Sequence, residues 1–477
     1  MTTNHEQQNC DIGIIGLGVM GRNLALNMSD HGFSVAGYDK DLTKVEALRK
    51  ESGDRKTCAA GDVSSFIAAL RIPRAMLILV PAGAAVDSVI GDLVPHLQKG
   101  DLIIDAGNSY FKDTDIRAAK LKKKDIRFFG VGVSGGEEGA RHGPSIMPGG
   151  PKDAYERVRP IFEAAAAQIK GEPCVTWLGP GSAGHFVKMV HNGIEYGVMQ
   201  LIAETYDLMK RGLGFDDDEL RDVYAEWNKG ELNSYLVEIT SQIFARNDER
   251  TGNRLINEIL DEAKQKGTGM WTSQSAMELQ VPTPTIDLAV AMRDISGVEG
   301  ERKRASGVYQ RPVRRIEGDR KALIAQLGHA LHAGVIITYA QGFAMLAVAS
   351  KKHEYGLDLE AIARIWRGGC IIRAALLDDI CGAFHAAHDL PNLLLAPAFA
   401  SKIVEHQECL RKIVCQAATS GIPSPGMMVS LGYLDAYRSA LLPANLIQAQ
   451  RDFFGAHTYE RIDDIGTFHT DWQVQKS

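Results

Sequence analysis

Cysteine is scarce in the sequence: seven of the 477 residues are cysteine, and none of them form a Cys-x-x-Cys pair. An odd number of scattered cysteines fits neither a disulfide framework nor a zinc ribbon, and it predicts reduced thiols in a cytoplasmic protein. A large excess of one charge is also lacking, since the chain has 53 Lys and Arg residues and 59 Asp and Glu residues, which gives a net charge of -6. This balance gives no electrostatic footprint for nucleic acid, although a local basic pocket could still bind an anion.

Long apolar runs are missing as well. The longest fall short of the roughly 18 consecutive apolar residues that a transmembrane helix needs, so we predict no membrane span. The first nine residues lack both a basic start and an apolar run, which excludes a secretory signal. The sequence contains no His-Glu-x-x-His, and His385 and His388 are interpreted as surface histidines, so no metal site is predicted.

The clearest pattern that is present lies near the amino terminus. A short apolar strand, Asp11 to Ile15, leads into Gly16-Leu17-Gly18-Val19-Met20-Gly21, a helical stretch to about His31 and a second strand, Phe33 to Tyr38, followed by Asp39. This is the strand, glycine turn, helix and acidic residue of a dinucleotide site. Gly16 makes the tight turn, Gly18 lets the backbone approach a pyrophosphate, and Gly21 allows helix and sheet to pack. A P-loop is excluded because its lysine and Ser/Thr are absent.

The alternation of strands and helices continues. Strands are expected at Met76 to Val80, Asp101 to Asp105 and Arg127 to Val133, with helices at Val86 to Leu97 and Asp113 to Lys123. Two loops should lie at the carboxyl ends of strands, where ligands bind in open α/β sheets: Ala106 to Ser109 and Ser134 to Ala140. The second offers N–H groups and a hydroxyl that suit a carboxylate, although a flexible turn explains it equally well. We predict a Rossmann-type α/β dinucleotide-binding domain over residues 1–182.

From Ala183 onward the pattern becomes helical, which predicts a large all-α domain over residues 183–442. Helices are expected at 186–211, 217–229, 232–244, 255–264, 283–294, 321–350, 359–365, 371–387 and 397–420, and the charge-rich stretch 299–315 is interpreted as a surface loop. Residues 443–477 form a tail with several aromatic residues. Such a tail is expected to dock, either on its own chain or on a partner subunit.

One stretch of this domain, Gly184 to Tyr196, carries a compact polar group. Lys188, His191, Asn192 and Glu195 stand at i, i+3, i+4 and i+7 and therefore share one helix face among apolar neighbours. Lys188 and Glu195 would be about 10 Å apart along the axis. A solvated amphipathic face is the simpler interpretation. Gly193 argues against it, because a glycine inside a helix costs roughly 1 kcal/mol and is usually kept where something approaches closely.

A dinucleotide fold beside this polar group suggests hydride transfer from an alcohol. Such a reaction needs a base for the hydroxyl proton, and a buried lysine with a lowered pKa can serve. Lys188 is the candidate base, and Glu195 is placed to handle later proton transfer.

Several motifs together carry a resemblance over the whole chain. They are Gly16 to Gly21, Ser134 to Ala140 with the following Gly-Pro-Ser-Ile-Met-Pro-Gly-Gly, the Lys188 helix, Lys266-Gly-Thr-Gly, Trp366-Arg-Gly-Gly-Cys-Ile-Ile-Arg, and Gln448-Ala-Gln-Arg-Asp-Phe-Phe-Gly-Ala-His. The chain resembles the decarboxylating 6-phosphogluconate dehydrogenases of the β-hydroxyacid dehydrogenase superfamily. The resemblance implies oxidation of 6-phosphogluconate at C3, loss of CO2 and protonation of the enediol to ribulose 5-phosphate.

The same resemblance assigns roles to residues. Lys188 matches the general base that later acts as an acid, and Glu195 matches the acid that protonates C1. The residues matched to substrate binding are Asn108, Ser134, Gly135, Gly136, His191, Asn192, Tyr196, Lys266, Thr268 and Arg293, with Arg451 and His457 supplied by the tail of the neighbouring subunit. A homodimer with exchanged tails is therefore expected.

The cofactor side departs from the family pattern. The residues matched to cofactor binding are Gly16, Leu17, Gly18, Val19, Met20, Gly21, Asp39, Lys40, Val80, Ala82 and Asn108. The family default is NADP, but Asp39-Lys40-Asp41 stands where the common form has Asn-Arg-Thr, and Pro81 replaces a lysine. Asp39 can accept hydrogen bonds from a free ribose hydroxyl and would repel a 2′-phosphate, which favours NAD or dual use.

Two other functions are compatible with parts of this pattern. A dehydrogenase of another β-hydroxy acid would share the glycine turn, but Lys266, Arg293 and Arg451 suit a dianionic phosphate better. A catalytically silent NAD(P)-binding sensor would be expected to have lost Lys188 or Glu195, and both are present.

Overall fold

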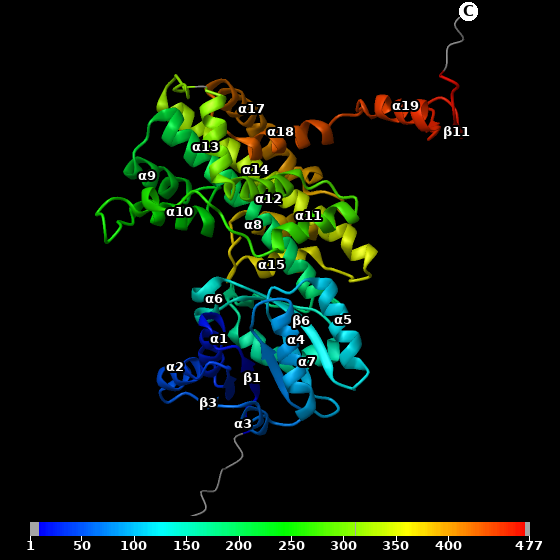
Figure 1. Ribbon diagram of the computed structural model, residues 1–477. Helices are drawn as coiled ribbons and strands as arrows, with labels where there is room; N and C mark the ends of the chain where they lie inside the picture. The colour runs from blue at the N-terminus through cyan, green and yellow to red at the C-terminus, as the bar shows by residue number, and fades with distance from the viewer. Residues whose placement is uncertain (1–8, 311, 473–477) are drawn as a thin grey trace, which may run out of the picture. The chain divides into compact units, whose positions relative to one another are not determined.

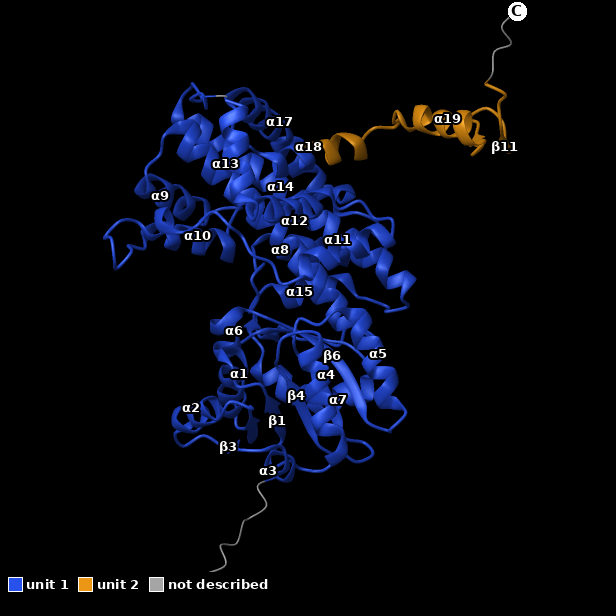
Figure 2. Cartoon of the chain, viewed as in Figure 1, with its two compact units in different colours: residues 1–430 blue, residues 431–477 orange. Residues whose placement is uncertain are grey.

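The computed structural model describes residues 9–310 and 312–472. The described chain divides into two compact units, residues 1–430 and residues 431–477, coloured blue and orange in Figure 2. Most of the amino-terminal segment on which the signal-peptide prediction rests, Met1 to Gln8, lies outside the described residues.

Unit 1 begins with a seven-stranded sheet (Figure 1). Its strands lie in the order β3-β2-β1-β4-β5-β6-β7; the first six are parallel, and β7 runs antiparallel to β6. The bounds are β1 Ile12–Ile15, β2 Val35–Tyr38, β3 Thr57–Ala60, β4 Ala75–Ile78, β5 Leu102–Asp105, β6 Arg127–Ser134 and β7 Ser145–Pro148. The order 3-2-1-4-5-6 is that of a Rossmann fold, so the predicted fold class is confirmed.

Alternation along the strands decides which helices cover which face of the sheet. Ile14 and Ile104 belong to one apolar cluster, with residues of α1 (Val19–Asp30), α2 (Leu42–Ser52) and α7 (Lys152–Ala165). Ile15 and Ile103 point the other way, into a cluster with residues of α3 (Val63–Ala68), α4 (Ala84–Leu93) and α5 (Phe111–Lys122). The sheet is therefore buried on both faces, which explains its continuous apolar strands.

Apart from a two-stranded hairpin, β8 (Gln168–Ile169) and β9 (Glu172–Pro173), the rest of unit 1 is helical. Its helices are α8 Ala183–Asp207, α9 Asp217–Trp227, α10 Tyr235–Ala245, α11 Thr268–Glu278, α12 Pro284–Ser296, α13 Glu299–Val308, α14 Arg320–Lys352, α15 Leu359–Trp366, α16 Leu376–Ala386 and α17 Pro397–Ser420, and α18 Pro425–Tyr437 crosses into unit 2. The predicted helices over 186–211, 217–229, 232–244, 283–294, 321–350, 359–365 and 397–420 are confirmed, with ends that differ by a few residues. A π-helical turn, Leu208–Leu213, finishes the first of them.

The longest of these helices, α14, explains an apolar stretch of the sequence. By length and composition alone it could cross a membrane, but 78% of its most apolar window is buried inside the protein. It packs against α8 and α17. We interpret it as the core helix of the helical region.

One helix prediction and one loop prediction are wrong, and one predicted helix begins later than expected. Only a 3-10 turn, Leu255–Glu258, forms in the stretch 255–264, where Ile259 and Leu260 are more than half exposed and no packing stabilises a helix. In the predicted loop 299–315, residues 299–308 form α13, whose first turn is acidic and whose Lys303 pairs with Glu299 one turn away. The helix expected from Ile371 begins only at Leu376, because the preceding residues bridge to Ser234.

Unit 2 is organised around a buried carboxylate. Its elements are helix α19 (Ala444–Gly455) and a two-stranded hairpin, β10 (Tyr459–Glu460) and β11 (Thr467–Phe468). Asp452 accepts hydrogen bonds from Thr458 N, Thr470 N and Trp472 Nε1, which ties the helix to the segments around the hairpin. These bonds give the tail a defined structure of its own.

Candidate active site

The glycine turn has the geometry that a dinucleotide site requires. Gly16 has a φ of +94°, and a Cβ there would lie 2.3 Å from the carbonyl oxygen of Leu79. A Cβ on Gly21 would lie 1.9 Å from the carbonyl oxygen of Gly16, so this glycine lets α1 pack on the turn. Gly18 faces open space and caps α1, whose first turn contains no acidic residue. The free N–H groups at this helix end are suited to a pyrophosphate.

Two cavities adjoin this turn. One of about 340 Å³ is lined by Gly16, Gly18, Asp39, Lys40 and Val80. The other, of about 610 Å³, is lined by residues that include Met20, Val80, Ala82, Asn108 and Lys266. Predicted cofactor and substrate residues therefore line adjoining cavities that share Val80. Leu17 differs from the others, because its side chain is fully buried and its N–H donates to Asp39 Oδ2 at 2.8 Å.

The charged side chains around the smaller cavity are paired with one another. Lys40 Nζ lies 2.8 Å from Asp92 Oδ2, and the hydrogen bond to this carboxylate raises the pKa of Lys40. Lys44 Nζ lies 3.7 Å from Asp39 Oδ2 and 3.8 Å from Asp41 Oδ2. Lys44 and Asp92 were not singled out in the sequence, since only the fold brings them to this cavity.

Close packing around α8 positions the polar stripe. A Cβ on Gly132 of β6 would lie 2.4 Å from Lys188 Cβ, so the strand lies directly against the helix at the candidate base. A Cβ on Gly193 would lie 2.6 Å from Thr272 Cγ2 of α11. The expected reason for a glycine inside this helix, close approach by another segment, is confirmed.

The stripe is buried and internally hydrogen-bonded. Lys188 Nζ donates to Asn192 Oδ1 at 2.7 Å, and Asn192 Nδ2 donates to Thr268 Oγ1 at 3.1 Å. His191 Nδ1 lies 3.0 Å from the same Asn192 oxygen, and its Nε2 lies 3.2 Å from Ser134 Oγ. Because an amide oxygen can only accept, His191 donates from Nδ1 and Nε2 accepts from the Ser134 hydroxyl. These bonds fix the orientation of four side chains around Lys188.

Burial shifts the titration of the acid and the base toward their neutral forms. It lowers the pKa of Lys188, against the opposing effect of Glu195. It raises the pKa of Glu195, against the opposing effects of Lys188 and Arg293, and it lowers that of His191 well below its ordinary value. A neutral lysine can accept a proton and a neutral carboxylic acid can donate one, so the pair suits acid–base catalysis. The solvated-face interpretation of the helix is wrong.

A second basic group meets the far end of the stripe. The Arg293 guanidinium stacks on the Tyr196 ring, 3.4 Å from its centroid. A Cβ on Gly269 would lie 2.4 Å from that ring, so α11 begins against it. Thr268 opens α11, and Lys266 precedes it and lines the larger cavity. Lys266, Arg293 and the amino terminus of α11 thus adjoin the Asn192 and Tyr196 side of α8.

The two strand-end loops lie on the sheet side of the site. Ser134 ends β6 and is buried, and its hydroxyl contacts His191 and the N–H of Ile371. Gly135 has a φ of +113° and starts the short helix α6 (Gly136–His142), so this loop is not a flexible turn. Asn108 is exposed and lines the larger cavity, in a loop held by hydrogen bonds from Gly107 and Ser109 to Asp105.

Arg451 and His457 belong to unit 2 and are exposed there. Arg451 donates to Gln448 within α19. Cys370 is one neighbour of Lys188 that the sequence analysis did not single out; it is fully buried, and Lys188 is among the groups that affect its pKa. Cys370 belongs to the motif that begins at Trp366. The motif identified this segment, but it did not show that Cys370 lies near Lys188.

Comparisons with known proteins agree along the whole chain. The NAD binding domain of 6-phosphogluconate dehydrogenase matches residues 11–179, and the C-terminal domain of 6-phosphogluconate dehydrogenase matches residues 184–472. The NADP(+)-dependent, decarboxylating 6-phosphogluconate dehydrogenase of Bacillus subtilis is 51% identical over 462 residues, which cover 97% of this chain and 98% of that protein. The decarboxylating enzyme of Escherichia coli is 49% identical over 462 residues, with the same coverage.

A solved structure shares the fold throughout. The 6-phosphogluconate dehydrogenase of Plasmodium falciparum, described in its apo form and in complex with NADP+ and with 6-phosphogluconate, superposes with a TM-score of 0.94. It is 44% identical and covers 97% of this chain and 100% of its own. With both domain models matched and relatives near 50% identity, the chain belongs to the decarboxylating 6-phosphogluconate dehydrogenase family.

Proposed function

We propose that this chain oxidises and decarboxylates 6-phosphogluconate to ribulose 5-phosphate and CO2, with reduction of NAD(P), and that Lys188 and Glu195 carry its proton transfers. The observation that carries this proposal is the buried stripe of α8, where burial favours a neutral lysine and a neutral carboxylic acid on one helix face. Family membership supports the reaction.

In the first step Lys188 removes the proton of the C3 hydroxyl while the C3 hydrogen leaves as hydride. The bound nicotinamide supplies the hydride acceptor. Lys188 Nζ donates an N–H to the Asn192 oxygen, and the Asn192 nitrogen donates to Thr268. The lone pair of the Lys188 amine therefore stays free to accept the proton of the substrate hydroxyl. A positioned base of this kind contributes roughly 10²- to 10⁴-fold in rate.

In the second step the protonated Lys188 donates to the C3 keto oxygen as the bond between C1 and C2 breaks and CO2 leaves. The electron pair left behind forms an enediol, because the developing charge on the oxygen is neutralised by that proton. Glu195 then protonates the carbon that becomes C1 of ribulose 5-phosphate, and Lys188 takes back the hydroxyl proton. The raised pKa of Glu195 supports its role as the donor.

The two ends of the substrate carry charge of the same sign, and the site offers each a partner. Lys266, Arg293 and Thr268 at the start of α11 are suited to the phosphate. Asn108 and the Ser134-Gly135-Gly136 segment are suited to the sugar-acid end, with His191 and Asn192 orienting the hydroxyls between them.

The cofactor preference follows from the charges of the smaller cavity. Lys40 is paired with Asp92, and Lys44 lies near Asp39 in the cavity and near Asp41 beside it, so both ammonium groups already have carboxylate partners. A 2′-phosphate would have to displace one of these pairs, whereas a ribose hydroxyl could donate to Asp39. This supports use of NAD, or of both cofactors.

The test is the initial rate with 6-phosphogluconate under matched NAD and NADP, with nicotinamide reduction and CO2 release measured together. We expect equal amounts of reduced cofactor and CO2, and a rate with NAD at least comparable to that with NADP. Reduction without CO2 would contradict the decarboxylation step. No reduction with either cofactor would indicate a sensor or a dehydrogenase of another β-hydroxy acid.

We also propose a homodimer in which the tail of each chain completes the site of the other. Unit 2 exposes a large apolar surface, since Leu446, Ile447, Phe453 and Phe454 are each at least 60% exposed. This supports docking on a second copy, with Arg451 and His457 reaching its phosphate site. Mixing two inactive variants, Lys188→Ala and Arg451→Ala, tests it: tail exchange predicts hybrids with one intact site and restored activity. A mixture that stays inactive after subunit exchange would refute it.

The domain limits that we propose are 1–182, 183–442 and 443–477. The seven free thiols support a cytoplasmic location.

A further inference from the structure

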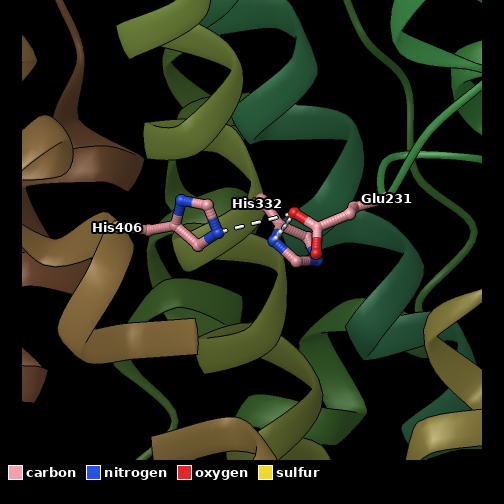
Figure 3. A group of neighbouring side chains, drawn as sticks. All are labelled: Glu231, His332 and His406. Carbon is pink, nitrogen blue, oxygen red and sulfur yellow. Dashed lines mark ion pairs between the residues drawn. The ribbon is translucent and has the colours of Figure 1, made fainter. Parts of the chain in front are cut away.

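Outside the α8 stripe, two buried histidines and a glutamate converge between helices. His332 lies on α14, His406 on α17, and Glu231 in the turn between α9 and α10 (Figure 3). One ligand atom from each lies within 4.8 Å of the other two. The three positions are about 75 to 175 residues apart in the sequence, so no local motif could reveal the group.

Three of the four ring nitrogens of this group lack hydrogen-bond partners among the described residues. Both nitrogens of His406 and Nδ1 of His332 are buried without a partner among the described residues, and the two residues are 1% and 3% exposed. Such orphaned polar atoms are rare, because leaving a buried group unpaired costs roughly 1 to 3 kcal/mol. They indicate a ligand that the protein alone does not supply.

The spacing is that of ligands around one ion. His332 Nδ1 lies 3.6 Å from Glu231 Oε2, and His406 Nε2 lies 3.5 Å from the same oxygen. These distances are too long for good hydrogen bonds. Two ligands each about 2.1 Å from a tetrahedral zinc ion lie roughly 3.4 Å from each other, which matches both pairs.

The surroundings hold the carboxylate in place and leave a route to the group. Lys402 pairs with Oε1 of Glu231, while both imidazoles face Oε2, so the ammonium group holds the carboxylate by its other oxygen. A cavity of about 240 Å³ lined by Glu231, His329 and His332 gives an ion a route to the group.

We propose that Glu231, His332 and His406 form a binding site for a zinc-like divalent cation. Two imidazoles and one carboxylate are the donor set of zinc sites that keep an open position. The ion would tie the turn after α9 to α14 and α17. Its three ligands are separate from the residues that carry the reaction, and its fourth position would be left to water.

The experiment is calorimetric titration of ZnCl2 into the chelator-treated, full-length protein, together with its melting temperature with and without zinc. We expect one ion per chain and a melting temperature that rises with zinc. Glu231→Gln and His406→Gln should each weaken binding by at least about tenfold and abolish the rise. Folding of each variant is checked by its activity with 6-phosphogluconate, and Glu231, half exposed, is the position where substitution disturbs packing least.

Two matched controls separate this site from adventitious binding. The double variant His385→Gln, His388→Gln removes two exposed histidines, and Cys415→Ser removes an exposed thiol; both should bind zinc as the wild type does. The proposal is overturned if the wild type takes up no zinc, if Glu231→Gln and His406→Gln bind it unchanged, or if a control variant loses it. Cobalt in place of zinc gives visible absorption bands that should disappear in the His406→Gln variant.

Discussion

Asn192→Asp is the substitution that probes the candidate base most selectively. The Asn192 oxygen accepts a 2.7 Å hydrogen bond from Lys188 Nζ and a 3.0 Å bond from His191 Nδ1. Aspartate keeps both acceptor contacts and nearly the same shape, but it adds a negative charge beside the lysine. It therefore changes the pKa of the base, and it also removes the bond that Asn192 Nδ2 donates to Thr268, which is why the pH profile rather than the rate alone is the readout.

The expected size follows from the distance. An opposite charge this close shifts a pKa by about 1 to 3 units, and here it favours the charged ammonium form, so the pKa of Lys188 rises. Each unit is tenfold in the neutral fraction below the pKa. At a fixed pH near neutrality, kcat should fall by roughly ten- to thousandfold, and the acidic limb of the rate profile should move up by about 1 to 3 pH units.

The assay is the pH dependence of kcat and kcat/KM with 6-phosphogluconate for the wild type and the variant. Asn228→Asp is the matched control, because Asn228 accepts bonds from Ser234 N and Asn233 Nδ2 well outside the stripe and an aspartate can keep both. The control should leave the acidic limb in place. A folded Asn192→Asp enzyme whose acidic limb does not move would show that Lys188 is not the group that must lose a proton.

Two further changes test the cofactor site and the helical core. Asp92→Asn should free Lys40 from its exposed ion pair, which is worth at most about 1 kcal/mol. The ratio of kcat/KM for NADP to kcat/KM for NAD should then rise by about two- to fivefold. An unchanged ratio would exclude Lys40 from the 2′ site. Burial raises the pKa of Glu204, which accepts from Gly426 N and Met427 N, from 4.5 to about 7. The folded state then binds this proton more tightly, so stability is greatest below pH 4.5 and falls by about 3 kcal/mol as the pH rises through 7. Urea unfolding at several pH values should show this loss in the wild type and not in Glu204→Gln, and parallel profiles would contradict it.

The sheet was predictable because its signals are local. Apolar strands joined to a glycine turn require backbone geometry that few other folds need, and Gly16 and Gly21 adopt it. Strand β3 was missed because its Thr-Cys-Ala-Ala sequence is half-buried at the sheet edge and lacks apolar alternation. The helix expected over 255–264 does not form, although its residues favour a helix. Its apolar side chains Ile259 and Leu260 stay exposed, so tertiary packing does not stabilise it.

The site also combines residues that local spacing predicts with contacts that it does not. Helical spacing was enough to place Lys188, His191, Asn192 and Glu195 on one face, because i, i+3, i+4 and i+7 always share a side of a helix. The contacts that tune them come from residues far away in the chain, such as Ser134 and Thr268. The sequence singled out the Ser134 loop from its place at a strand end, and Thr268 only through the family resemblance. Lys44 and Asp92 were not identified, because the smaller cavity is formed by the ends of β1, β2 and β4 together with α2 and α4, and such an arrangement leaves no periodic pattern.

The central claim is that Lys188 moves the proton of the substrate hydroxyl, and Lys188→Ala tests it most directly. The measurement is kcat with 6-phosphogluconate at saturating cofactor, beside Lys170→Ala, which removes an exposed lysine paired with Asp378. Loss of a positioned base predicts a fall of at least about 100-fold for Lys188→Ala and none for the control. Turnover by the Lys188→Ala enzyme within about tenfold of the wild type, far less than the loss of a base costs, would contradict the account.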